Sequence, residues 1–149
     1  MKLADDLREF VALLNSANVE HLIVGGHAVG YHGYPRYTGD IDIFVRRSPE
    51  NAARVASVLD SFGFGGLGAD ADTFLKPDMV VQLGRPPNRI DILTRISGVD
   101  FEDAWPNRER ALLDGVPVAM IGRDALLANK RASGRPKDLA DLRELEETK

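Results

Sequence analysis

The stretch LIVGGHAVGYHGYPRYTGDIDIFV (residues 22–45) contains two short apolar runs separated by a segment rich in glycine. The first run ends in Gly25 and Gly26, a pattern typical of a buried strand followed by a tight turn. Residues 27–34 are expected to form a short helix. The stretch therefore predicts a strand, a helix and, after a loop at Pro35, a second strand.

The second apolar run carries acidic side chains at regular spacing. Ile41, Ile43 and Val45 alternate with Asp40 and Asp42, so one face of the predicted strand belongs to the core and the other carries two carboxylates. Like charges that close are costly unless a cation or strong donors neutralise them. The pattern indicates a divalent metal site, although an Asp-x-Asp is also common on a solvated strand face.

The rest of the chain supplies helices and strands that extend this unit. From the periodicity and turn residues we expect a helix over 3–14, a helix from Ser48 and Pro49 to about Phe62, paired strands in DMVVQLG and NRIDILTRI, a short helix in FEDAWPNRE, two strands around Asp114-Gly115, and two helices between about 123 and 145 divided at 134–136. This order predicts an α/β (α+β) domain with a mixed sheet, flanked by helices and closed by a C-terminal helical pair.

Composition limits the classes of protein and site. The 149 residues are 44% hydrophobic, which fits one domain over residues 1–149. There is no cysteine, so a metal would need oxygen or imidazole ligands. The formal net charge of −4 argues against a protein that coats nucleic acid. No signal peptide or membrane-spanning run is recognisable, and we expect a cytoplasmic protein without membrane contact.

Asp91 is the best candidate for a third carboxylate. It alternates with Ile90 and Ile92 as Asp42 does with its neighbours, and the two strands could bring the three carboxylates together if they pair. A hard cation such as Mg²⁺, or Mn²⁺, takes one or two carboxylates together with water and phosphate oxygens. Such sites serve phosphoryl displacement.

The sequence resembles a known family over most of its length. The glycine pair, spacer and Asp-x-Asp of residues 22–45 look like the signature of nucleotidyltransferases of the DNA polymerase beta type, in particular the minimal bacterial members that include the AbiEii-like toxin group. The resemblance continues through GRPPNRIDILTRISGVDFEDAW and LLANKRASGRPKDLADLREL. It implies a polymerase-beta-type fold and the transfer of a nucleoside monophosphate from an NTP to an acceptor hydroxyl.

The same resemblance assigns roles to matching positions. Gly25 and Gly26 correspond to the phosphate-binding turn, Asp40 and Asp42 to the metal ligands, and Asp91 to the third carboxylate. Many relatives have serine where this chain has Gly26, so any phosphate contact there is through the backbone alone.

Basic residues are further nucleotide-binding candidates. The tail resembles a lysine followed by a Lys/Arg-Asp-x-x-Asp element, which implies Lys130 as a triphosphate contact with Lys137 and Asp138 in support. The same segment also reads as a solvated amphipathic helix. Arg36 could clamp phosphate with its planar guanidinium or form a surface ion pair.

The acceptor and the partners stay open at this point. A tRNA end, a partner protein side chain or a small hydroxylated molecule would suit the chemistry, and the acceptor could reach the site from a partner chain or in a homodimer. The resemblance implies an association with toxin–antitoxin systems. The alternative is a non-catalytic nucleotide-binding antitoxin or adaptor with the same fold.

Overall fold

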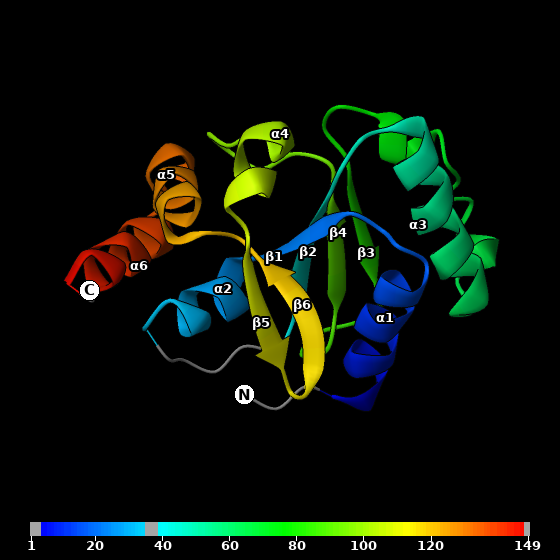
Figure 1. Cartoon of the computed structure of the whole chain (residues 1–149), viewed down its shortest axis with the longest axis horizontal. Helices are drawn as coiled ribbons and strands as arrows, with labels where there is room; N and C mark the ends of the chain where they lie inside the picture. Colours follow the sequence, from blue (N-terminus) through cyan, green and yellow to red (C-terminus); the bar gives the residue numbers. More distant parts are fainter. Residues whose placement is uncertain (1–3, 35–38, 148–149) are drawn as a thin grey trace.

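A six-stranded mixed sheet forms the centre of the computed structural model, which describes residues 4–34 and 39–147 (Figure 1). The strand order is β3-β4-β2-β1-β6-β5. β1 pairs parallel to β6 and β2 parallel to β4, while the other neighbours are antiparallel. The strands are β1 (His21–Val24), β2 (Ile41–Val45), β3 (Val80–Leu83), β4 (Ile90–Leu93), β5 (Glu109–Leu113) and β6 (Val116–Met120). The predicted mixed sheet is confirmed.

Helices lie on both sides of this sheet. They are α1 (Asp5–Ser16), α2 (Gly25–Tyr31), α3 (Pro49–Ser61), α4 (Phe101–Ala104), α5 (Arg123–Ser133) and α6 (Pro136–Glu147), with short 3-10 turns at Gly65–Leu67, Thr73–Leu75 and Trp105–Asn107. In Figure 1, α1 and α3 lie on one side of the sheet, and α2, α5 and α6 on the other. The C-terminal helical pair is confirmed, with Pro136 as the first residue of its second helix.

The second helix begins earlier in the chain than the sequence predicts. The helix expected over 27–34 begins at Gly25 and ends at Tyr31. Gly25 has φ +69°, a conformation that glycine adopts without steric cost. The chain therefore turns from β1 directly into α2, and the glycine pair belongs to the first turn of the helix.

The core fills the face of the sheet toward α1 and α3. Ile41, Ile43 and Val45 are fully buried there, as the alternation predicts. The opposite face of β2 is acidic only at its start, because Phe44 is buried too and packs edge-on against Phe101 at 5.2 Å between ring centroids. Period-2 alternation identified the core face and missed this second apolar contact.

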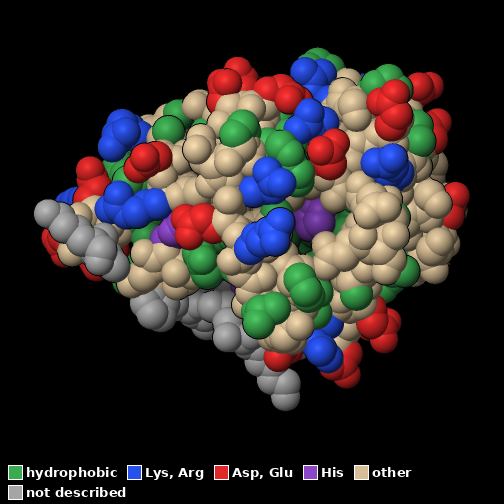
Figure 2. Space-filling view, viewed as in Figure 1, with side chains coloured by type: hydrophobic (Ala, Val, Ile, Leu, Met, Phe, Trp, Pro, Cys, Tyr) green, Lys and Arg blue, Asp and Glu red, His purple; other side chains and the backbone are tan. Residues whose placement is uncertain are grey.

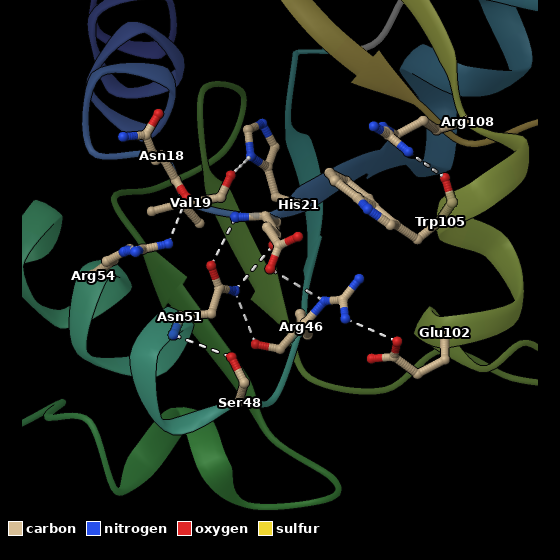
Figure 3. A network of polar contacts seen from close by, with 11 residues as sticks. Asn18, Val19, His21, Arg46, Ser48, Asn51, Arg54, Glu102, Trp105 and Arg108 are labelled. Atoms are coloured by element: carbon tan, nitrogen blue, oxygen red, sulfur yellow. Dashed lines mark hydrogen bonds and ion pairs between the residues drawn. The ribbon is translucent and has the colours of Figure 1, made fainter.

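A buried asparagine fixes the end of β2 against its neighbours (Figure 3). The Asn51 side chain accepts a hydrogen bond from the Glu20 backbone N–H at 2.7 Å and donates to the carbonyls of Glu20 and Arg46 at 3.0 and 2.9 Å. Ser48 caps α3 by accepting from the Asn51 backbone N–H at 3.2 Å. Because every polar group of Asn51 is paired, its burial ties α3 to both β1 and β2.

The surface mixes charges of both signs. On the face in Figure 2, acidic and basic side chains are interspersed without a broad basic area. Of the helices in the described ranges, none combines the length and the apolar character needed to cross a bilayer.

Candidate functional site

Two of the three predicted aspartates are direct neighbours across the sheet. β2 and β4 pair so that Asp42 is opposite Asp91. Burial, the nearby charge of Asp91 with a hydrogen bond to it, and the charge of Asp40 together raise the pKa of Asp42 to about 6, while Lys130 acts in the opposite direction. The pair is thus a crowded, half-buried acidic centre that favours neutralisation by a proton or a cation.

Gly25 allows α2 to approach this centre closely. A Cβ atom at Gly25 would overlap Oδ2 of Asp42, and the positive φ would strain any other residue. The first turn of α2 can therefore lie against the carboxylate only with glycine at this position.

Arg89 connects the remaining aspartates. Its guanidinium donates to both oxygens of Asp91, from Nε to Oδ1 at 2.7 Å and from Nη2 to Oδ2 at 3.1 Å. Its backbone N–H donates to Oδ1 of Asp40 at 2.8 Å, and Nη2 lies 3.7 Å from Oδ2 of the same residue. Asp40 itself lies one residue before β2. Arg89 was not among the predicted site residues, although residues two apart in an extended segment share a face and Arg89 and Asp91 have that spacing.

The donor set suits a hard divalent cation. In the described part of the chain, no three acidic or histidine side chains are grouped closely enough to cage an ion by themselves. Mg²⁺ does not require such a cage, because it is usually held by one or two carboxylates and by substrate phosphates. A carboxylate offers about four acceptor positions, so the two bonds from Arg89 leave room on Asp91. Asp42 and Asp91 therefore fit the predicted cation.

A pocket of about 370 Å³, the smaller of two pockets described for this chain, opens beside Asp42. It brings together several residues predicted from sequence and others that were not. The predicted residues in its lining are Gly25, Gly26, Asp42, Lys130, Lys137 and Asp138, and further polar residues are Arg95, Ser97, Asn129, Ser133 and Arg135. Asp40 and Asp91 are not in the lining, although Asp91 is paired with Asp42. Arg36 lies outside the described residues.

Lys130 is buried in this lining and does not project freely into the pocket. Its Nζ lies 3.3 Å from Oδ1 of Asp138 and 3.2 Å from Oδ2 of Asp141, and all three side chains are almost completely buried. The ammonium thus links α5 to α6, and its predicted contact with triphosphate stays a prediction. Asp141 was not selected from sequence, although it lies one helical turn after Asp138.

Asp138 is the centre of this polar cluster. Burial alone would raise its pKa, but hydrogen bonds from Arg135 at 2.6 Å, from Ser133 at 2.7 Å and from Lys130 outweigh that effect and lower the pKa to about 2. Asp138 is therefore held as a carboxylate. It fixes the turn between α5 and α6, so that Arg135 in the turn and Lys137 in the first turn of α6 lie along the pocket.

Comparisons with known proteins identify the fold. The sequence matches no family model and no curated protein. Among solved structures it is similar to a nucleotidyltransferase-like antigen of Paracoccidioides brasiliensis, with a TM-score of 0.54, 17% identity and coverage of 98% of this chain and 76% of that one. It is also similar to a candidate nucleotidyltransferase of Thermotoga maritima, with a TM-score of 0.58, 14% identity and coverage of 96% and 91%.

A third similar structure contains a small molecule. It is the lincosamide antibiotic adenylyltransferase LnuA with bound lincomycin, at a TM-score of 0.58, 15% identity and complete coverage of both chains. At such identities the likeness concerns the arrangement of the backbone. The chain described here has the nucleotidyltransferase fold.

Proposed function

We propose that this chain is a metal-dependent nucleotidyltransferase that moves a nucleoside monophosphate from an NTP to an acceptor hydroxyl. The observation that carries the proposal is one wall of the smaller pocket, where Asp42, in register with Asp91, lies against the glycine pair at the start of α2. The shared fold of the three solved structures supports the same reaction class.

Asp42 and Asp91 would hold Mg²⁺ or Mn²⁺, with Asp40 at the adjacent position. When bound, the cation would neutralise the carboxylates and the phosphate charge that faces them. The raised pKa of Asp42 supports this role, because crowded carboxylates in a half-buried site gain from any divalent cation.

The triphosphate would lie along the smaller pocket. Gly25 and Gly26 expose backbone without a side chain, and Arg95, Arg135 and Lys137 are exposed cations of the lining that can reach phosphate oxygens. Lys130 would act from its buried position in the pocket wall, where it adds positive charge near Asp42 and holds α5 against α6.

In the proposed reaction, the acceptor oxygen forms a bond to the α-phosphorus of the NTP. The bond from that phosphorus to the oxygen of the β-phosphate breaks, and its electron pair leaves with pyrophosphate. The proton of the hydroxyl passes to a carboxylate oxygen of Asp91. The chain contributes chiefly orientation and charge neutralisation, which is the usual route for phosphoryl and nucleotidyl transfer.

The alternative of a nucleotide-binding protein without turnover has an observation in its favour. Arg89 already neutralises Asp91 and contacts Asp40, as an internal cation would. Such a protein would bind NTP in the smaller pocket and leave it intact. A place in a toxin–antitoxin system is compatible with either version, and so is a protein or tRNA acceptor.

The two versions differ in a labelling experiment. The protein is incubated with each α-labelled NTP, Mg²⁺ or Mn²⁺ and a cell extract divided into small-molecule, RNA and protein fractions. Transfer predicts label in one fraction, lost with Asp42→Asn and kept with Asp6→Asn, an exposed aspartate of α1 on the other side of the sheet. Nucleotide binding by calorimetry without label in any fraction would favour the non-catalytic alternative.

A further inference from the structure

A larger pocket of about 990 Å³ adjoins the smaller one. Both are lined by Arg95 and Ile96, and α5 contributes its first half to the larger pocket and its second half to the smaller. Phe44 of the larger pocket is two residues beyond Asp42 on the same face of β2, which corresponds to about 7 Å along a strand. A ligand in the larger pocket would therefore lie next to the carboxylate centre.

The two pockets carry opposite charge. The smaller pocket is lined by four basic and two acidic side chains: Arg95, Lys130, Arg135 and Lys137 against Asp42 and Asp138. The larger pocket is lined by four acidic and two basic side chains: Asp100, Glu102, Asp103 and Asp124 against Arg47 and Arg95. In Figure 2, acidic side chains gather over α4 at the top of the view.

Most of this acidic charge is not used within the fold. Glu102 pairs with Arg46 at 2.8 Å (Figure 3). Across residues 4–34 and 39–147, no ion pair neutralises Asp100, Asp103 or Asp124. These three carboxylates thus remain able to attract a ligand of positive charge.

The floor of the larger pocket is apolar and closely packed. Phe44, Phe101 and Ile96 are buried in it. Arg46 lies over the Phe101 ring at 5.1 Å and Trp105 stacks on that ring at 5.4 Å, so Phe101 is held from several directions. A volume of this size with an apolar floor and a polar rim is typical of sites for drug-sized molecules.

We propose that the larger pocket holds the acceptor, and that the acceptor is a small organic cation that carries the reacting hydroxyl. This inference rests on the proposed function and specifies the substrate class of the same site. A polyanion such as an RNA end would meet repulsion from the acidic rim, whereas an ammonium group would gain from it. The basic pocket then takes the triphosphate and the acidic pocket the amine, and the two reactants meet beside Asp42, where the pockets adjoin.

Binding of two matched trisaccharides tests this without any turnover. The probes are the trimer of glucosamine, with three ammonium groups and free hydroxyls, and its N-acetylated counterpart, with the same skeleton and no charge. Each is titrated calorimetrically at low ionic strength into the wild type, into Asp100→Asn/Asp124→Asn, and into a control with the same charge change, Asp5→Asn/Asp6→Asn on α1. Binding of ATP with Mg²⁺ is measured on all three proteins.

We expect the glucosamine trimer to bind the wild type and the control equally, and to bind the rim variant about tenfold more weakly, which corresponds to about 1.4 kcal/mol. The acetylated trimer should not bind, and ATP affinity should be the same in all three. Equal binding of both trimers, equal weakening by the control, or displacement of the trimer by a short RNA would overturn the proposal. Loss of ATP binding with retained trimer binding would instead refute the proposed function and leave the cation pocket standing.

Discussion

Replacing Asp42 by asparagine should stabilise the metal-free protein at neutral pH. The pKa of Asp42 is about 6 in the folded chain against a usual value of 3.8, so the folded state holds its proton more tightly than the unfolded state. Stability from this group is therefore fully present below about pH 4 and is lost as the pH rises through about 6. A pKa difference of about 2 corresponds to about 3 kcal/mol.

Asparagine has nearly the same shape as aspartate and stays neutral at every pH, so the variant does not lose stability as the pH rises through about 6. The assay is urea and thermal unfolding of both proteins in chelator between pH 4 and 8. The stability difference in favour of Asp42→Asn should grow with pH and level off above about pH 7. At that plateau it should approach about 3 kcal/mol, or roughly 6 to 12 °C in Tm for a chain of this size.

Two further arms identify the cause. With Mg²⁺ and a non-hydrolysable NTP, the wild type should gain more stability than Asp42→Asn, because only the wild type offers the full carboxylate pair. In an Asp91→Asn background the pH-dependent difference should shrink without vanishing, since burial is the largest cause of the shift and Asp91 the next. A difference between wild type and Asp42→Asn that is independent of pH would refute this reasoning.

Further substitutions test the rest of the site. Gly25→Ala should abolish nucleotide binding and destabilise the fold by clearly more than the roughly 1 kcal/mol expected for the control Gly68→Ala. Gly68 also has a positive φ, of +76°, but an added Cβ there has nothing within 4 Å, so equal costs of the two variants in urea unfolding would contradict the close approach at Gly25. Lys130→Met should cost about 3 to 5 kcal/mol because it removes the buried ammonium that lies between the carboxylates of Asp138 and Asp141. A cost below about 1 kcal/mol would mean that the ammonium is solvated. Because the pKa of Asp138 is lowered to about 2, its carboxylate stabilises the fold fully above about pH 4, and the stability difference between wild type and Asp138→Asn should shrink as the pH falls toward 2. A difference that stays constant with pH would exclude the carboxylate charge as its source. Arg89→Met should tighten Mn²⁺ binding measured without nucleotide by about fivefold, or about 1 kcal/mol, and weaker binding would show that Arg89 supports the cation site and does not compete with it.

Local patterns predicted most of the secondary structure. Ser48 and Pro49 marked the start of α3, and Asp114-Gly115, with φ of 50° and 81°, marked the turn between β5 and β6. These features depend on backbone conformations that a few adjacent residues impose. The start of α2 was misplaced because a glycine pair is compatible with a separate turn or with a helix start, and only the contact with Asp42 selects the second.

For the site, the sequence alone determined which residue types could bind a cation and which face of β2 would carry them. The alternation of Asp42 with buried isoleucines follows from the period of a strand and needs no knowledge of the neighbours. Tertiary structure alone decided that β4 pairs with β2 in the register that places Asp91 opposite Asp42, because pairing between distant segments is not encoded by local spacing. It also decided that Arg89 clamps Asp91, that Lys130 is buried between α5 and α6, and that an acidic pocket adjoins a basic one. Each of these depends on side chains from separate elements meeting in space, which only the packed chain brings about.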